Sequence, residues 1–594
     1  MSKKKSVLYF IPLILLLTVV PLIVRMHVYQ SQMAQFEWTA AAPDRLDFFL
    51  YYKSVAITLI AAVMCVLLAI RFKIRQKEFK FCYEFIPLLI YAVLTFLSSV
   101  FSQYRYFSFH GADEVFETLW VVLGYCVIAF YAYQMVNTFE DLDCIMKWLT
   151  VGLIFMLIIG MLQATGHDFF TSEAGQKLVT GGKGSIGLAF EPGRVFLSMY
   201  NPNYVASYFA LMIPVEITLL IQNKKWYWRL IYTVMLILSI ICLMASGNRS
   251  AIVAFAATIV FILIMYNKRI LKAWKMVVPI TAVIAVVFGA YISKNDLIIQ
   301  KFIGLFNAQE RADDPISEIV TGDEDVAITF QGQVFRTSYD VSDEGYINVH
   351  LYDGNQEPVN STFDEATYTY AVQDERYPGF TVQAVNLNQE LALGVFAGNV
   401  TWYFKKGDDG TYYYYNVYGR WDKINNAPRV LVKFLEKKFE ERGTIWSKTI
   451  PLLKNCLIFG TGADTYTFVY PQDDYVDKTY DGSLNALDVK PHCFYLQVAV
   501  QSGIPALIAV LVFYIWYFIT GIRLYAKAEY QDGMEIIGAG LLFATFSYMI
   551  ISFLNDSTVT VAPIFWIMMG LGAAVNEILK KKKSSRPELA ESHN

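Results

Sequence analysis

The chain is poor in charged residues and contains little histidine. Only 17% of its 594 residues are Asp, Glu, Lys or Arg, and six are histidines. The net charge of -3 is not the basic excess that neutralising a phosphate backbone requires, so nucleic acid is not an expected partner. The seven cysteines stand singly, without a Cys-x-x-Cys pair or a Cys/His ligand spacing, so neither a disulfide framework nor a zinc site is predicted. We expect Cys456 and Cys493, which fall in the predicted outer region, to be free thiols.

Long apolar runs dominate what is present. Hydrophobic residues make up 55% of the chain, more than a soluble protein of this length needs to fill its core. The first run, Val7 to Val24, follows three lysines and lacks a small-residue cleavage site, so we interpret it as a retained span. With a window of about 20 residues, about twelve transmembrane helices are predicted. They lie near 7–24, 49–70, 85–101, 118–137, 144–163, 203–222, 228–246, 250–266, 274–293, 494–519, 536–553 and 558–576.

Lys and Arg are concentrated in alternate short loops, which predicts the orientation of the chain in the membrane. The loops after the second and eighth spans and the basic tail 580–594 hold most of them, so both termini are predicted to be cytoplasmic. Because each span reverses the side of the membrane, the same assignment places 25–48, 102–117, 164–202, 246–250 and the long stretch 294–493 on the outer face.

The sequence therefore divides into a membrane domain with spans 1–9 (1–293), an extracytoplasmic region (294–493), and a membrane domain with spans 10–12 (494–579). Within the outer region, short alternating runs between turn signals predict a β-rich sandwich or barrel over about 323–423. We expect the tyrosine run Tyr412 to Tyr415 to pack in the core of this module rather than to stack on sugars. An amphipathic helix is predicted from Val430 to Phe439, at the start of an arm over about 430–493 that returns to the membrane.

One histidine stands out by position. His492 follows Lys490-Pro491 and directly precedes an apolar span, so its imidazole is expected near the outer surface of the bilayer, where it could accept a proton from a sugar hydroxyl. The alternative is an interfacial histidine with a purely structural role. The remaining histidines, His27, His110, His167, His350 and His593, show no ligand or triad spacing.

Three arginines on the predicted outer face are candidates for binding phosphate. Arg249 lies in a very short connection between two spans, where an unpaired guanidinium is costly. Arg194 precedes the mouth of another span, and Arg442 follows the amphipathic helix. A guanidinium suits phosphate oxygens bidentately, whereas a salt bridge or headgroup contact explains each arginine taken alone. Together with His492 they indicate a diphosphate-lipid site.

Several short motifs occur in a fixed order on this face. They are Tyr200-Asn201-Pro202-Asn203-Tyr204, Gly247-Asn248-Arg249-Ser250-Ala251, Arg442-Gly443-Thr444-Ile445-Trp446, Phe459-Gly460-Thr461-Gly462, Tyr470-Pro471, and His492-Cys493 followed after nine residues by Gly503-Ile504-Pro505-Ala506. This set resembles the O-antigen ligase and O-antigen polymerase family of bacterial membrane glycosyltransferases, over about residues 190 to 300 and 435 to 520. Cys493 and Ala506 depart from the pattern, where the family has an amide or hydroxyl residue and a glycine.

The resemblance implies inverting, metal-independent transfer of a glycan from an undecaprenyl-diphosphate carrier, at the outer face of the bacterial plasma membrane and without a cofactor. It assigns His492 as general base, Arg194, Arg249 and Arg442 as diphosphate ligands, and Asn201, Asn203 and Gly503 as possible support. The acceptor would be a lipid, a wall polymer, a protein or another glycan. The protein itself would be in contact with membrane lipids.

Three alternatives stay open at this point. A repeat-unit polymerase would use the same donor chemistry as a ligase. Metal-dependent transfer would need paired carboxylates, for which the chain offers Asp44-Arg45-Leu46-Asp47 and Asp323-Glu324-Asp325, the latter more typical of an acidic turn. A twelve-span transporter is expected to show two similar halves joined by an inner loop, whereas the long interruption here is predicted to be outside.

Overall fold

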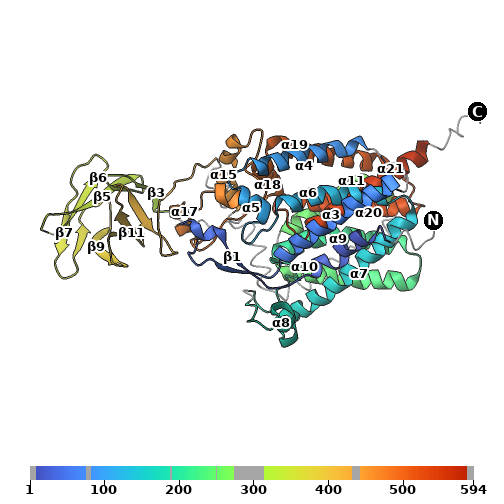
Figure 1. Ribbon diagram of the computed structural model, residues 1–594, viewed down its shortest axis with the longest axis horizontal. Helices are drawn as coiled ribbons and strands as arrows, with labels where there is room; N and C mark the ends of the chain where they lie inside the picture. Colours follow the sequence, from blue (N-terminus) through green and yellow to red (C-terminus); the bar gives the residue numbers. More distant parts are fainter. Residues whose placement is uncertain are drawn as a thin grey trace, which may run out of the picture.

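The computed structural model describes residues 8–74, 80, 82–187, 190–248, 250–272, 314–344, 346–430, 436 and 442–584. Its longer helices are α2 (Ile11–Thr18), α3 (Tyr51–Ala69), α4 (Ile86–Val100), α6 (Leu119–Met135), α7 (Phe139–Ala164), α9 (Pro202–Gln222), α10 (Trp226–Ser246), α11 (Ser250–Lys272), α18 (Phe494–Ser502), α19 (Ile504–Tyr525), α20 (Gly533–Ile551) and α21 (Ala562–Ser584). Shorter helices are α5 (Arg105–His110), α8 (Glu173–Thr180), α15 (Arg442–Thr449), α16 (Tyr466–Val469) and α17 (Tyr475–Asp481). Figure 1 shows a helical body at one end, a β-rich region at the other, and α15 and α17 between them.

The helical body has the surface of a membrane protein. Eight of the described helices are long and apolar enough to cross a bilayer. Helices α9, α20 and α21 lie mostly inside the bundle, whereas α3 turns large apolar side chains such as Leu59 and Val66 outward. Exposed apolar surface of this extent is unfavourable in water and suits contact with lipid tails.

The structure confirms a mostly helical protein with eight candidate spans, but not the full set of twelve. Three expected spans fall on shorter apolar helices, Ile11–Leu22, Leu119–Met135 and Ser250–Met265, and the span expected at 274–293 lies outside the described residues. The expected span 494–519 is interrupted, because Gly503 adopts a φ of 98° and separates α18 from α19. The last helix is also longer than expected, since α21 continues to Ser584, into the predicted basic tail 580–594.

The β-rich region contains two antiparallel sheets that share one core. One has four strands in the order β3 (Ile316–Thr321), β4 (Val326–Phe330), β5 (Gln333–Val341) and β6 (Ile347–Asp353). The other has seven, in the order β13 (Trp421–Asp422), β12 (Tyr412–Tyr415), β11 (Val400–Lys406), β10 (Glu390–Ala397), β9 (Thr381–Leu387), β8 (Thr369–Val372) and β7 (Ser361–Asp364). Ile328 and Phe335 of the first sheet and Val395 and Trp402 of the second belong to the same buried cluster.

This arrangement confirms the expected β-rich module, with its strands over 316–422 rather than 323–423. Alternation along β12 buries Tyr412 and Tyr414 and leaves Tyr413 and Tyr415 partly exposed, as the period of two in a strand requires. Tyr412 and Tyr414 join the shared core, which confirms core packing for two of the four tyrosines.

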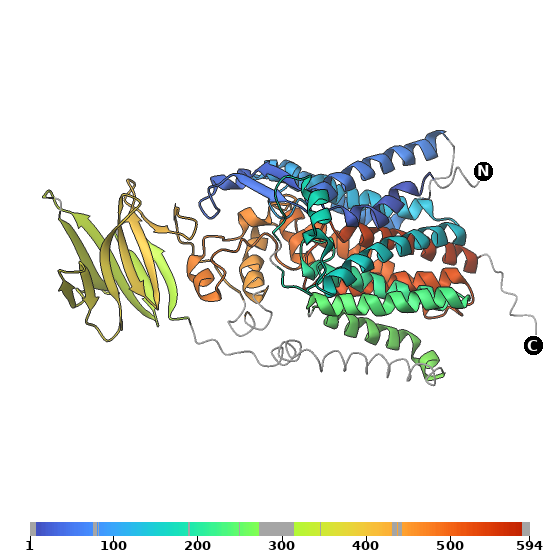
Figure 2. The same ribbon diagram turned by 90° about the horizontal axis from the view of Figure 1, so that it is seen from below.

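Within the described part of the chain, two segments link the β-rich region to the helical body. The first is the hairpin of β1 (His27–Gln30) and β2 (Asp44–Asp47), whose tip accepts hydrogen bonds from Arg420 at Ala34 O (2.9 Å) and Phe36 O (2.8 Å). The second is the arm 442–493, which Figure 2 shows between the two parts. Apart from Val430 and Glu436, the helix expected over 430–439 lies outside the described residues.

Candidate functional site

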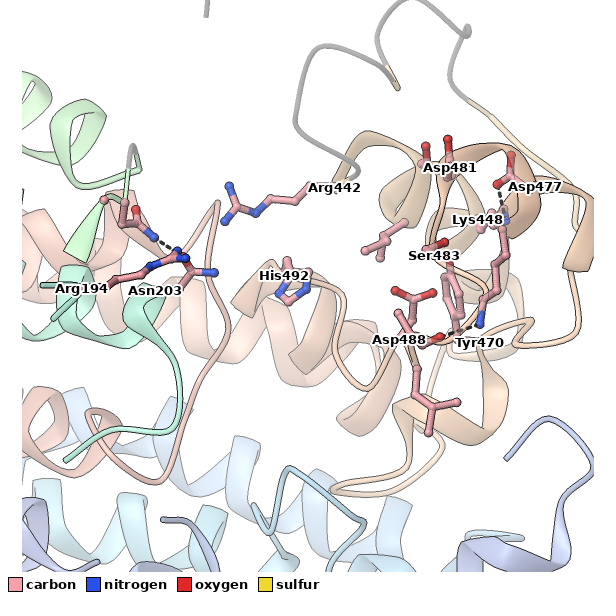
Figure 3. A pocket seen from close by; sticks show the side chains of 17 residues that line it. Arg194, Asn203, Arg442, Lys448, Tyr470, Asp477, Asp481, Ser483, Asp488 and His492 are labelled. Atoms are coloured by element: carbon pink, nitrogen blue, oxygen red, sulfur yellow. Dashed lines mark hydrogen bonds and ion pairs between the residues drawn. The ribbon is translucent and has the colours of Figure 1, made fainter. Parts of the chain in front are cut away.

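A cavity of about 510 Å³ lies where the arm meets the helical body, a size typical of small-molecule sites. Its lining residues come from distant parts of the chain: Arg194, Asn203, Gly247, Asn248, Arg442, Thr444, Ile445, Lys448, Tyr470, Asp477, Lys478, Asp481, Ser483, Ala486, Leu487, Asp488 and His492. Four residues that the sequence assigns to the site, Arg194, Asn203, Arg442 and His492, therefore share one cavity (Figure 3).

His492 is held in an unusual backbone conformation by one carboxylate. Its φ of 51° lies in the left-handed region, which a residue with a Cβ rarely adopts without compensation. Asp556 supplies that compensation: one oxygen accepts a hydrogen bond from His492 Nδ1 (2.9 Å) and the other from Cys493 N (3.0 Å). The Asp556 side chain is 2% exposed, whereas that of His492 is 40% exposed. A proton on Nδ1 leaves Nε2 as the basic nitrogen of the neutral ring.

Two of the three predicted arginines, Arg194 and Arg442, line the cavity. Arg194 follows a turn and is exposed, and within the described part of the chain no carboxylate or carbonyl pairs with its guanidinium. Arg442 is the first residue of α15 and is half-buried. Arg249 lies outside the described residues, but its neighbours Gly247 and Asn248 line the cavity. A guanidinium with an open approach, such as that of Arg194, is suited to bind an anionic group.

Asparagine side chains join two of the sequence motifs at the cavity wall. Asn201 caps α9 by accepting a hydrogen bond from Asn203 N (2.8 Å), so its role is to begin that helix. Asn203 in turn accepts a hydrogen bond from Asn248, and Asn248 Oδ1 accepts one from Ser250 N (2.8 Å). Asn203 faces the cavity and Asn201 does not line it.

Gly503, predicted as possible support, has a structural role away from the cavity. With a φ of 98°, it lies so close to the 458–460 segment that a Cβ would stand 2.5 Å from Ile458 O. Gly460 is equally crowded, because a Cβ there would stand 2.2 Å from the carbonyl carbon of Gln501. Backbone hydrogen bonds from Thr461 N to Val500 O and from Gly462 N to Gln501 O, both 2.9 Å, complete the contact. These glycines let the arm pack against α18, the helix that begins two residues after His492.

Sequence reasoning missed the charged network behind His492. Glu117 accepts hydrogen bonds from Ser557 Oγ (2.5 Å), Gln497 Nε2 (2.7 Å) and Tyr125 OH (2.9 Å). Lys490 Nζ lies 3.8 Å from Glu117 and donates to Ser557 O (2.6 Å). Both side chains are almost fully buried, so each compensates the other. The network fixes the short connection that carries Asp556. The only sign of this network in the sequence was a charged residue between two apolar spans.

The end of the cavity formed by the arm has paired charges. Lys448 Nζ contacts Asp474 (2.8 Å) and Asp477 (2.6 Å), and Arg429 also binds Asp477 (2.5 Å). Burial lowers the pKa of Lys448, but the two carboxylates outweigh it and raise the pKa above its usual range. Burial raises the pKa of Asp488, against the opposing charges of Lys478 and His492.

The carboxylate pairs considered for metal-dependent transfer have other partners. Asp47 accepts hydrogen bonds from Leu50 N and Tyr51 N, both 2.9 Å, at the start of α3. Asp323 accepts one from Thr411 and Asp325 pairs with Arg336, which makes them an acidic turn between β3 and β4. Among the described residues, no group of three or more His, Cys, Asp or Glu side chains is placed to hold a metal ion. Cys456 and Cys493 are free thiols, as expected.

Comparison with known proteins adds no relative: no family model matches the chain, and a search of curated proteins finds no match. The chemistry of the site must therefore be inferred from the residues themselves.

Proposed function

We propose that this protein is an inverting, metal-independent glycosyltransferase of the O-antigen ligase type, moving a glycan from an undecaprenyl-diphosphate carrier to an acceptor hydroxyl at the outer face of the bacterial plasma membrane. One observation supports this most strongly. The cavity brings Arg194 and Arg442 around His492, whose ring is clamped by the buried Asp556. The order of the sequence motifs, which resembles that family, supports the same proposal.

The geometry suits a single displacement. Nε2 of His492 takes the proton of the acceptor hydroxyl while that oxygen bonds to the anomeric carbon of the donor sugar. The bond from this carbon to the diphosphate oxygen breaks, and the diphosphate leaves with the electron pair. Arg194 and Arg442 stabilise its charge in a partly enclosed site, where electrostatic stabilisation is strong. Asp556 stabilises the imidazolium that forms and keeps the correct tautomer, as a carboxylate does beside other catalytic histidines.

The first test is His492→Ala in cells that make the protein, with surface glycan analysed on gels. We expect attached glycan to disappear and carrier-linked chains to accumulate, because no base remains to activate the acceptor. His167→Ala is the matched control, since His167 is exposed and does not line the cavity. Unchanged attached glycan in the His492 variant would refute the assignment.

The length of the accumulated product separates the two related activities. Long unattached chains indicate a lost ligase, whereas single repeat units indicate a lost repeat-unit polymerase. Arg194→Lys keeps the charge but loses the fork of donors, so we expect the KM for the donor to rise about tenfold.

A further inference from the structure

The cavity has two chemically different ends on either side of His492. We call the residues Arg194, Asn203, Asn248 and Arg442 the membrane end, and the residues Tyr470, Lys478, Asp481, Ser483 and Asp488 the arm end. In Figure 3, Arg194 and Asn203 lie on one side of His492, and Ser483 and Asp488 on the other. A substrate that spans the cavity must therefore pass the imidazole.

The arm end is poorly suited to a second phosphate. With the neighbouring lining residues Lys448 and Asp477, the charged groups on this side of the cavity are three aspartates and two lysines. Lys448 and Asp477 already pair with each other at 2.6 Å. Lys478 Nζ donates to Gln472 Oε1 and Ala486 O, both 3.1 Å away. What remains is a surface of hydroxyl and carboxylate oxygens without the excess positive charge that an anion requires.

Two polar groups at the arm end have hydrogen-bonding capacity to spare. Within the described part of the chain, neither the Ser483 hydroxyl nor the Asp488 carboxylate is hydrogen-bonded. Asp488 is partly buried, four residues before His492, and its charge is close enough to interact with that ring. A partly desolvated carboxylate without a donor is unfavourable, and sugar hydroxyls would supply donors.

The stereochemistry of the proposed reaction assigns a substrate to this end. An inverting displacement requires the attacking oxygen to approach the anomeric carbon from the face opposite the leaving group. If the diphosphate occupies the membrane end, the attacking hydroxyl comes from beyond His492, where the arm end lies. Resting on the proposed function, we infer that the arm end is the acceptor subsite and binds a neutral carbohydrate through Asp488 and Ser483.

The β-rich region supports this subsite. Tyr475 and Val476 of α17 belong to the core of that region. The Tyr475 hydroxyl donates a hydrogen bond to the Asp422 carboxylate (2.5 Å) and accepts one from the Asn416 amide (3.0 Å). Helix α17 ends at Asp481, two residues before Ser483. The insert thus positions the wall that contacts the acceptor without entering the cavity itself.

The test measures how the full-length protein in lipid nanodiscs divides donor glycan between a sugar and water. The donor is the carrier-linked glycan isolated from His492→Ala cells, and the acceptor probes are chitotriose and maltotriose over a range of concentrations. For Asp488→Asn we expect the trisaccharide concentration for half-maximal transfer to rise about tenfold, and the donor KM to change less than about twofold, as for loss of one charged hydrogen bond. For Ser483→Ala we expect the trisaccharide concentration for half-maximal transfer to rise by a smaller factor.

Asn485→Ala is the matched control, because Asn485 is exposed on the same loop and does not line the cavity. An unchanged division of glycan in both Asp488→Asn and Ser483→Ala, or an equal rise in the donor KM, would overturn the acceptor subsite. So would release of glycan to water by the wild type with no transfer to either trisaccharide. A wild type that neither releases nor transfers glycan would contradict the proposed function itself.

Discussion

The β-rich region and the helical body place their charged groups differently. In the β-rich region the core is aromatic and aliphatic, and ion pairs such as Lys405 with Glu390 lie toward the surface. Where the helical body meets the end of the arm, Glu117, Lys490 and Asp556 are almost fully buried behind one histidine. Buried charges are costly unless each has a partner, so their concentration beside the cavity separates a functional region from a supporting one.

The largest expected effect tests the functional side of this comparison. Asp556→Asn keeps the size of the side chain but loses the charge that stabilises an imidazolium, so we expect kcat to fall about a thousandfold. Transfer by the purified variant and its thermal unfolding should be measured together. Asp532→Asn, which removes a surface ion pair with Lys582, serves as control. A variant of Asp556 with normal kcat would remove this carboxylate from the mechanism.

The supporting side is tested by a cavity in the β-rich core. Trp402 is fully buried there, so Trp402→Ala is expected to destabilise that region by about 4 kcal/mol. Hydrogen exchange should increase across β10 and β11 while helices such as α9 keep their protection. Trp402→Phe should lose much less stability, because the indole nitrogen has no hydrogen-bond partner among the described residues and its removal breaks no bond. Equal loosening of the helices would show that the two regions unfold together.

A third prediction concerns pH at the junction between the regions. Burial, with the nearby carboxylates Asp422 and Asp474, raises the pKa of Asp473 to about 6. The folded state therefore binds this proton more tightly than the unfolded state. The protonated carboxyl of Asp473 thus stabilises the folded state at low pH, and this contribution to the free energy of unfolding is lost as pH rises from about 4 to about 6. The loss is at most about 3 kcal/mol, since one pKa unit corresponds to about 1.4 kcal/mol. Thermal unfolding of Asp473→Asn should show a flatter pH profile; a profile identical to wild type would contradict the assignment.

The smallest effect is expected where the hairpin meets the β-rich region. Arg420→Ala removes two hydrogen bonds to the hairpin tip and an ion pair with Glu37, which together should contribute about 1 kcal/mol. Faster hydrogen exchange over 31–38 is the measurement. Arg376→Ala, whose partners Asp353 and Asp374 lie within the β-rich region, should leave the hairpin unchanged. Unaltered exchange in the Arg420 variant would show that the contacts of this arginine do not stabilise the hairpin tip.

Local pattern was sufficient for some features and insufficient for others. The strand-like composition of the tyrosine run predicted that it packs in a core, because strand propensity is a property of neighbouring residues. The structure buries two of its four side chains, Tyr412 and Tyr414. The interruption at Gly503 was missed, since apolar composition alone does not reveal that the helix must break to let the 458–460 segment approach. The importance of Asp556 was also missed, because its two partners stand 64 and 63 positions away in the chain.

The sequence by itself predicted a helical protein with many apolar spans and a β-rich insert. The short motifs singled out Asn203, Arg442 and His492, and position on the predicted outer face singled out Arg194. Only the tertiary structure decided that these four side chains line a common cavity, that Asp556 clamps the histidine, and that the arm closes the opposite end. The physical reason is that the alternation of buried and exposed side chains depends on adjacent residues. Contact between the side chains of a site depends on how helices far apart in the sequence pack together.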